Sequence, residues 1–408
     1  MKKFILAGYL CFLCLPALAA NDYSKDAESY AQRNNVSLSE AERALNIEMH
    51  KDELLKIIED EYKGRIAGIY IENSPEYTIV VRLKGNGANS KRELSIKNAL
   101  PGVEVPVRFE YGAKETKEAA KGQVQKAQRL AEKYFDTVQI VSYNERTGNI
   151  DVEINSKSSP EVSSKMSKIQ EEWKNPKIPL NVELVSYSIS PMGLAYGGTP
   201  VIDKSLVGST GLAYRCTTGF GVKDSAGRKY MSTAAHCRDN FEDKYTGAKY
   251  YFVDEIPYAE SNDLQWNSTT ETITNQFRDG VNSTRTLSGR RTLRYTNAGD
   301  QVCHYGSSTG FSCGVVQAVG VSISSIDPVN GWKFPGNFWV KVRTSDPKDC
   351  APGDSGGPVF TGRTLASGIV SLDLTEDYDD NDPTNDACIG YLYLPTDKVY
   401  ESGLSFVY

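Results

Sequence analysis

The stretch GDSGGP at residues 353–358 decides how the rest of this 408-residue chain is interpreted. A serine between glycines, here Ser355, can occupy a tight turn that presents its hydroxyl, with backbone N–H groups placed to face a developing oxyanion. A serine hydroxyl is a poor nucleophile until a neighbouring base accepts its proton. Histidine suits that role because its unperturbed pKa is about 6.5. The stretch therefore predicts a nucleophilic serine served by a histidine.

The chain has only three histidines, so the base is found almost by elimination. His236 lies in TAAHC at residues 233–237, at the end of an apolar strand, where small neighbours leave one face of the ring open. His50 lies in the N-terminal half, and His304 directly follows a cysteine. An α/β-hydrolase needs its histidine after the serine. No histidine follows Ser355, so that fold is excluded and His236 is the predicted base.

The third member should be a carboxylate that orients the imidazole and stabilises its cation. Fourteen carboxylates lie between His236 and Ser355, so position has to decide. Asp263, in SNDLQW at residues 261–266, leads into an alternating apolar strand, a context that can half-bury a carboxylate. Asp263 is therefore the predicted acid, and Asp254 is the second choice.

The first twenty residues have the pattern of a secretory signal peptide. Lys2 and Lys3 precede an apolar run over residues 4–15, and ALA at residues 17–19 is a small-x-small cleavage site. We therefore expect a signal peptide over residues 1–19. A membrane anchor is disfavoured because the run is shorter than the ~20 residues that a span needs. The mature chain is expected to be secreted, extracellular or periplasmic, with no membrane association.

Six cysteines remain after the signal peptide, all beyond residue 190. In an exported chain this number indicates three disulfides, although arithmetic allows fifteen pairings. A metal site is disfavoured because the chain has no CxxC pair beyond residue 20 and no histidine cluster. The order along the chain suggests the pairs Cys216–Cys237, Cys303–Cys313 and Cys350–Cys388.

The two halves of the chain differ in composition. Residues 21–190 hold 8 glycines, whereas residues 191–408 hold 25. The second half has short runs of Val, Tyr, Thr and Ser between turn signals, which is typical of an all-β sandwich or a pair of barrels. The net charge of −6 gives no electrostatic reason to bind nucleic acid.

The first half predicts an α+β domain without recognisable chemistry of its own. A capping box, Ser39-x-x-Glu42, predicts the start of an amphipathic helix. We expect hairpins over 66–71 with 77–83 and over 138–143 with 149–154, helices over 114–135 and 159–173, and a strand over 178–189.

With these motifs together, residues 195–408 resemble a trypsin-like serine protease of the chymotrypsin clan. The likeness is greatest to the bacterial branch typified by α-lytic protease and the streptogrisins. TAAHC, SNDLQW and GDSGGP carry it, VCHYGSSTGFSCG at 302–314 resembles a short disulfide loop, and YESGLSFVY at 400–408 resembles the C-terminus of that branch. RIAGIYIENSPEYTIVVRLKG at 65–85 resembles part of the long pro-regions of the branch.

The resemblance implies an all-β protease domain of two six-stranded antiparallel β-barrels, at residues 193–295 and 296–408. An α+β pro-region at residues 20–192 would precede it. The pro-region would assist folding, inhibit the protease, and be removed by self-cleavage between Ser190 and Leu194. It would be the chain's own partner before and after cleavage.

The resemblance also implies roles for single residues. His236, Asp263 and Ser355 would be catalytic, and the N–H groups of Gly353 and Ser355 would form the oxyanion hole. We expect a peptide or protein substrate, a monomer, and no metal or organic cofactor. The walls of the specificity pocket would include Ala351, Pro352, Ser371, Leu372 and Asp373.

Three features depart from the branch. His304 stands where the branch has an arginine that pairs with the aspartate before the nucleophile, here Asp354; a His304–Asp354 pair and a surface histidine are both open. The stretch from Cys350 to Gly353 is one residue shorter than usual. The acidic stretch at 376–386 could bind calcium, although a solvated loop is favoured.

Two other classes of protein share this fold. A protease-like binding module would have lost a member of the Ser-His-Asp set, and none is missing here. An esterase would use the same residues, and matched amide and ester substrates would distinguish it from a peptidase.

Overall fold

The computed structural model describes residues 24–191, 198–203, 214–244, 246–256, 262–281, 283–323, 336–376 and 387–408. The predicted signal peptide and the acidic stretch beyond residue 376 lie outside the described residues. Among the described helices, none is both long and apolar enough to cross a membrane.

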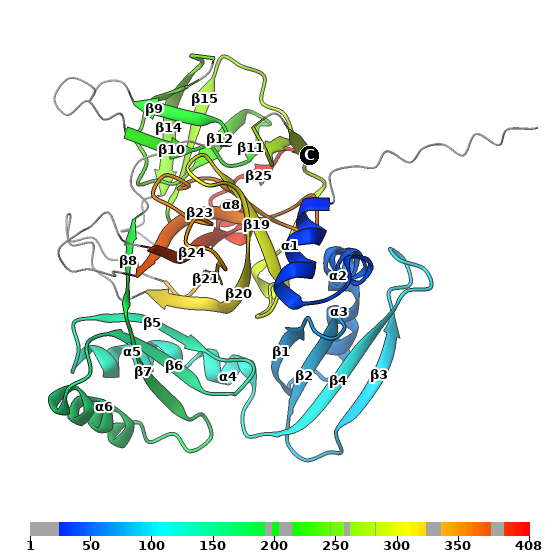
Figure 1. Ribbon diagram of the computed structural model, residues 1–408, viewed down its shortest axis with the longest axis vertical. Coiled ribbons are helices and arrows are strands. Elements are labelled where there is room, and N and C mark those ends of the chain that lie inside the picture. Colours follow the sequence, from blue (N-terminus) through cyan, green and yellow to red (C-terminus); the bar gives the residue numbers. More distant parts are fainter. Residues whose placement is uncertain are drawn as a thin grey trace, which may run out of the picture.

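Residues 24–113 form a lobe in which three helices lie beside a four-stranded sheet (Figure 1). The apolar sides of the helices and of the sheet share one buried core. The predicted hairpin is confirmed, with Ile71 opposite Ile79. The elements are α1 (Ser24–Asn34), α2 (Leu38–His50), α3 (Asp52–Glu61), β1 (Ile66–Glu72), β2 (Thr78–Lys84), β3 (Ser90–Ser95) and β4 (Glu104–Ala113), in the sheet order β1-β2-β4-β3.

The predicted capping box of α2 is wrong by two residues. Ser37 has an extended backbone, and its hydroxyl accepts a hydrogen bond from the Glu40 N–H at 3.1 Å. Ser39 already lies inside α2. Both serines fit the pattern S-x-x-E, so the pattern alone does not distinguish them.

Residues 117–185 form a second lobe of helices and a three-stranded sheet. The predicted hairpin and the predicted helix near residue 160 are confirmed. The single helix expected over 114–135 is instead two, because the first ends at Gly122, a residue with low helix propensity. The elements are α4 (Lys117–Lys121), α5 (Val124–Glu132), β5 (Val138–Tyr143), β6 (Ile150–Asn155), α6 (Pro160–Glu172) and β7 (Leu180–Val185).

The strand expected over 178–189 is also two. β7 pairs with β6 inside the second lobe, whereas β8 (Tyr187–Pro191) leaves the lobe and pairs with a strand of the C-terminal half. Figure 1 shows β8 as an extended segment running from the lobe to that half.

The first sheet of the C-terminal half has eight strands in the order β10-β9-β13-β14-β15-β12-β11-β25. Its last strand comes from the C-terminus, so the end of the chain pairs back with the first sheet. The strands are β9 (Pro200–Asp203), β10 (Tyr214–Thr217), β11 (Gly221–Lys223), β12 (Lys229–Thr233), β13 (Phe241–Asp243), β14 (Lys249–Ile256), β15 (Leu264–Thr269) and β25 (Ser405–Phe406).

The second sheet contains a closed antiparallel barrel of six strands, because the path β19-β22-β23-β24-β21-β20 returns to its start through pairing of β20 with β19. The predicted fold class, an α+β region followed by an all-β protease fold, is confirmed. The barrel strands are β19 (Gln301–Gly306), β20 (Gly310–Ile323), β21 (Trp339–Arg343), β22 (Pro358–Thr361), β23 (Leu365–Glu376) and β24 (Ala387–Pro395). Smaller elements are β16 (Gln276–Arg278), β17 (Thr284–Thr286), β18 (Gly289–Arg290), the 3-10 turn η3 (Leu293–Tyr295) and α8 (Thr396–Glu401).

The three predicted disulfides are confirmed. They join Cys216 to Cys237, Cys303 to Cys313, and Cys350 to Cys388.

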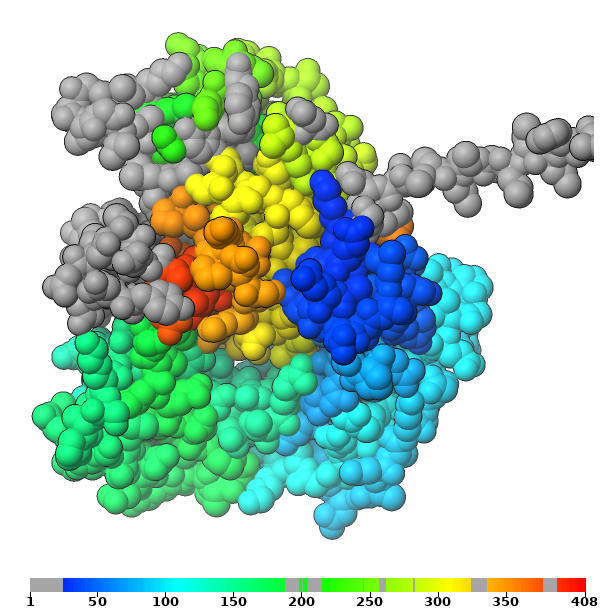
Figure 2. Space-filling view, viewed as in Figure 1, coloured from blue at the N-terminus to red at the C-terminus, as the bar shows by residue number. Residues whose placement is uncertain are grey.

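The N-terminal half contacts the second barrel on two sides. β5 pairs with β20, with Val141 opposite Ser322, so the sheet of the second lobe continues into the barrel. The helices α1 and α2 lie against the same barrel on another side, and Figure 2 shows this blue surface pressed against yellow and orange segments.

Candidate active site

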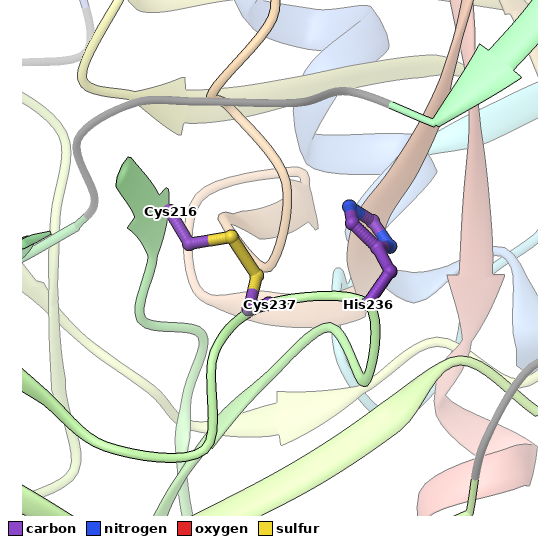
Figure 3. Close-up of side chains that lie close together, drawn as sticks. All are labelled: Cys216, His236 and Cys237. Atoms are coloured by element: carbon purple, nitrogen blue, oxygen red, sulfur yellow. A yellow bond between two sulfur atoms is a disulfide. The ribbon is translucent and has the colours of Figure 1, made fainter. Parts of the chain in front are cut away.

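His236 is held at a fixed place by the covalent structure beside it. It follows β12, and the adjacent Cys237 is joined to Cys216 in β10, as Figure 3 shows. These three side chains are close enough to suggest a metal site. The two sulfur atoms are bonded to each other, however, so neither is a thiolate ligand. The disulfide therefore anchors the histidine segment.

Asp263 lies directly before β15 and is completely buried against His236. Its Oδ2 is 2.8 Å from His236 Nδ1, and its Oδ1 accepts the His236 backbone N–H at 2.9 Å. The Ser371 hydroxyl, in β23, also donates to Oδ2. The second choice of acid, Asp254, is exposed on β14.

The charge of Asp263 is stabilised despite its burial. Burial by itself would raise the pKa of this carboxyl. The interaction with His236 and the hydrogen bonds from His236 and Ser371 outweigh that effect and hold the pKa below its usual value. The carboxylate can therefore remain ionised beside the imidazole.

Ser355 completes the arrangement from the second barrel. Its Oγ lies 2.9 Å from His236 Nε2. A carboxylate on one ring nitrogen favours a proton there, which leaves the other nitrogen able to accept the hydroxyl proton. The structure thus brings together the three predicted residues, and we call Ser355, His236 and Asp263 the Ser-His-Asp group.

The turn around Ser355 requires glycine at two positions. Gly353 has φ +107° and Gly356 has φ +85°, and a Cβ on Gly356 would stand 2.0 Å from the carbonyl oxygen of Thr217. Thr217, at the end of β10, donates from its hydroxyl to the Gly353 carbonyl at 2.8 Å and from its N–H to the Ser355 carbonyl at 2.6 Å. A strand of the first sheet therefore holds the turn around Ser355 in the second, a contact that no sequence motif indicates.

The predicted oxyanion residues, Gly353 and Ser355, both lie in this turn. The aspartate between them, Asp354, is completely buried. It accepts hydrogen bonds from the Thr309 hydroxyl at 2.7 Å and from the Ser308 N–H at 3.1 Å.

His304 is not a surface residue, so that interpretation is wrong. It is completely buried in β19, with its ring edge-on to Tyr391. Its Nε2 lies 3.4 Å from Asp354 Oδ2 and 3.3 Å from the Thr309 hydroxyl. Burial follows from its position in a strand of the closed barrel.

The predicted pocket residues fall into two groups. Ala351 is half-buried and Pro352 exposed before the nucleophile turn. The other group lies in β23 and is buried: Ser371 contacts Asp263, as described above, and the side chain of Leu372 packs in the core. β23 pairs antiparallel with β8, and this places Leu372 opposite Pro191 and Asp373 opposite Ser190. The structure therefore places the end of the N-terminal half beside these pocket residues.

Comparisons with known structures find similar bacterial proteases. A protease from Nocardiopsis is 26% identical, and the match covers 48% of this chain and 93% of that one with a TM-score of 0.35. Protease A of Thermobifida fusca is 22% identical, with 52% and 98% covered and a TM-score of 0.37. A Cellulomonas bogoriensis chymotrypsin is 22% identical, with 52% and 97% covered and a TM-score of 0.35. These TM-scores are low, so the family assignment does not depend on them.

No curated protein matches the chain. The family model described as Trypsin matches residues 213–386, the part of the chain that contains the whole Ser-His-Asp group. Residues 213–386 therefore belong to the trypsin family, and this part of the chain is a chymotrypsin-like serine protease.

Proposed function

We propose that this protein is a secreted serine endopeptidase made as a zymogen, which cleaves peptide bonds with Ser355, His236 and Asp263. The observation that carries the proposal is the unbroken series of contacts from Asp263 through His236 to Ser355, at 2.8 and 2.9 Å. Three ionisable or nucleophilic groups in this order suit acyl transfer.

The mechanism follows from these contacts. Ser355 attacks the carbonyl carbon of the peptide bond while His236 accepts the hydroxyl proton, and Asp263 stabilises the imidazolium. The N–H groups of Gly353 and Ser355 would bind the oxyanion of the tetrahedral intermediate. His236 then gives the proton to the leaving amine, and a water molecule hydrolyses the acyl-enzyme by the same steps. No cofactor takes part.

The N-terminal half is proposed to be an inhibitory pro-region. β8 adds an antiparallel strand to β23 directly after Ser371, whose hydroxyl contacts Asp263. Extended peptides commonly bind sheets by adding such a strand. While β8 occupies this edge, a substrate strand is excluded from it. The proposed cut between Ser190 and Leu194 would separate this strand from the protease half.

The same half is proposed to assist folding of the protease. The pairing of β5 with β20 provides a preformed sheet on which a long barrel strand can align. Non-local strand pairing is intrinsically slow to form, because loop closure costs entropy before contacts are made. A folded template beside β20 would reduce that cost.

Export is supported by two features. The leader at residues 1–19 has the order of charge, apolar run and small residues that signal peptides have. The three disulfides persist in oxidising compartments outside the cytoplasm.

The test of this function is Ser355→Ala in the full chain. We expect loss of peptide cleavage and accumulation of the uncut chain, measured with a peptide-amide library and by mass spectrometry. Ser167→Ala, an exposed serine in α6, is the matched control and should process normally. A cut product of normal size from Ser355→Ala would show that another protease is the activator, and full activity would reject the proposal.

A further inference from the structure

A cluster of charged side chains, none of them a member of the Ser-His-Asp group, is buried between α2, α3 and the second barrel. Glu48 and Lys51 come from the N-terminal half, and Arg291 and Asp300 come from the protease half. Each of the four is at most 2% exposed. We call these four residues the Glu48 cluster.

The contacts of the cluster cross from one half of the molecule to the other. Lys51 forms an ion pair with Asp300, and Arg291 donates a hydrogen bond to the carbonyl oxygen of Glu48. The Glu48 carboxyl reaches the barrel itself, where its Oε1 accepts the Thr361 hydroxyl at 3.0 Å. Two further ionic contacts join the halves: Asp52 of α3 pairs with Arg291, and Asp26 of α1 pairs with Arg285 at 3.0 Å. Charged contacts therefore hold the helices on the barrel.

Glu48 is the incompletely paired carboxyl of the cluster, and Arg291 Nε is also without a hydrogen-bond partner among the described residues. Its Oε2 is buried and has no hydrogen-bond partner among the described residues. A buried ionised oxygen without a partner is costly, so the neutral carboxyl is favoured in the docked state. Burial, and then the charge of Asp300, raise the pKa of Glu48 to about 8, although Lys51 and Arg291 oppose this. The titratable and charged groups around it are Tyr30, Lys51, Tyr77, Arg291, Asp300 and Tyr393.

We propose that Glu48 is a pH-dependent latch that holds the N-terminal helices on the protease half while its carboxyl is protonated and releases them when it ionises. The proposal rests on the proposed function, in which the N-terminal half is an inhibitory pro-region, and on the expectation that this half remains a partner of the protease after the cut. It adds a condition for release, namely a rise in pH around the cut protein.

The direction of the effect follows from the sign of the shift. The pKa of Glu48 is higher docked than in water, so its contribution to docking is fully present below its ordinary value of 4.5 and is lost as the pH rises through about 8. One coupled proton changes the docking constant by at most about tenfold per pH unit in this window. Burial lowers the pKa of Lys51, which acts in the opposite direction. The test therefore compares variants of Glu48 and does not depend on the pH profile of the parent alone.

The first experiment uses the full chain with Ser355→Ala, so that neither cleavage nor activity is needed. The melting temperature is measured from about pH 6 to about pH 9 for this parent and for the same chain with Glu48→Gln, whose amide imitates the protonated carboxyl. Because the window begins at 4.5, the Glu48→Gln chain should already be the more stable of the two at pH 6, and its advantage should grow up to about pH 8 and then level off. Glu42→Gln, on the exposed side of α2, is the matched control and should follow the parent. Should the amide fail to fold, Glu48→Met is uncharged and similar in length.

The second experiment uses the protein that has processed itself. Size-exclusion chromatography measures how much of the N-terminal fragment elutes with the protease fragment. In the cut wild type, the Kd for the N-terminal fragment and the protease fragment should rise with pH, up to about pH 8, by at most about tenfold per pH unit more than in the cut Glu48→Gln protein. Parallel pH profiles of parent and Glu48→Gln in the uncut chain would overturn the latch. Failure of the wild type to cut itself would contradict the proposed function and leave the result on the uncut chain intact.

Discussion

The Ser-His-Asp group and the Glu48 cluster both contain a carboxyl that is almost completely buried, yet the two carboxyls differ in charge. Both oxygens of Asp263 accept hydrogen bonds, and the pKa of this residue is lowered. One oxygen of Glu48 has no partner among the described residues, and the pKa of this residue is raised. Burial is common to both, so the neighbouring charges and the hydrogen-bond donors together decide which carboxyl keeps its charge: His236 and the donors lower the pKa of Asp263, whereas the charge of Asp300 adds to the effect of burial on Glu48. A charged Asp263 can stabilise the imidazolium of His236. A neutral Glu48 can hold the N-terminal helices on the protease half until it ionises.

The largest expected effect comes from removing the charge of Asp263. Asp263→Asn should lower kcat by about 10⁴-fold, because the amide favours the wrong tautomer of His236 and does not stabilise its cation. The measurement is steady-state hydrolysis of a peptide amide. Asp254→Asn, an exposed residue on β14, is the control and should keep full activity. The opposite ranking of these two variants would show that the acid has been assigned wrongly.

A smaller change makes Asp263 more like Glu48 by removing one donor. Ser371→Ala deletes the hydroxyl that donates to Asp263 Oδ2. A hydrogen bond to a charged group contributes about 1.5–3 kcal/mol, so kcat should fall by about ten- to a hundredfold while KM changes little.

The same variant has a consequence for the pH dependence of stability. The lowered pKa of Asp263 contributes stability that is present above the ordinary pKa of an aspartate and is lost as the pH falls through the lowered value. Without the Ser371 hydroxyl the pKa rises, so acid unfolding of the variant should begin at a higher pH. Ser367→Ala, in the same strand, is the matched control, because that buried hydroxyl has no hydrogen-bond partner among the described residues. An equal loss of kcat in both variants would indicate damage to β23 and no specific role for Ser371.

The contrast also explains how much the sequence could predict. His236 and Ser355 stand in short motifs, and the small residues and glycines of these motifs are required by the local backbone. Because the chain has only three histidines, few other candidates for the base remain. The disulfide order and the two hairpins of the N-terminal half depend on neighbours along the chain, and they could be predicted for the same reason. Asp263 required the further argument that its strand is half-buried.

Contacts between distant segments could not be predicted in this way. The Ser371 hydroxyl meets Asp263 across 108 residues, and Thr361 meets Glu48 across 313. Each depends on how sheets and helices dock, which no local period encodes. Glu48 in particular occupies an ordinary buried position of an amphipathic helix, where an apolar residue would fit the pattern equally well. A special role for the Glu48 carboxyl can be inferred only from the structure, which places Asp300 beside it.

His304 gives the finest test of the comparison, because Asp354 beside it has several hydrogen-bond donors as well as this imidazole. The Thr309 hydroxyl and the backbone N–H groups of Ser308 and Ala351 already hold Asp354, while His304 is at 3.4 Å. An arginine keeps its charge throughout the alkaline range and can bind a carboxylate with two parallel hydrogen bonds. If the charge of His304 helps to hold the turn, His304→Arg should extend activity a few-fold toward alkaline pH.

His304→Gln, neutral at every pH, is the matched control and should not extend activity toward alkaline pH. The measurement is the pH profile of kcat/KM for the cut protease, with unfolding monitored separately so that loss of structure is not counted as loss of activity. Profiles of the same shape in the parent and both variants would mean that the neutral donors hold Asp354 without help from His304. In that case the buried aspartate before the nucleophile would behave like Asp263, with its charge secured by hydrogen bonds, and the imidazole would serve only to fill the space beside Tyr391.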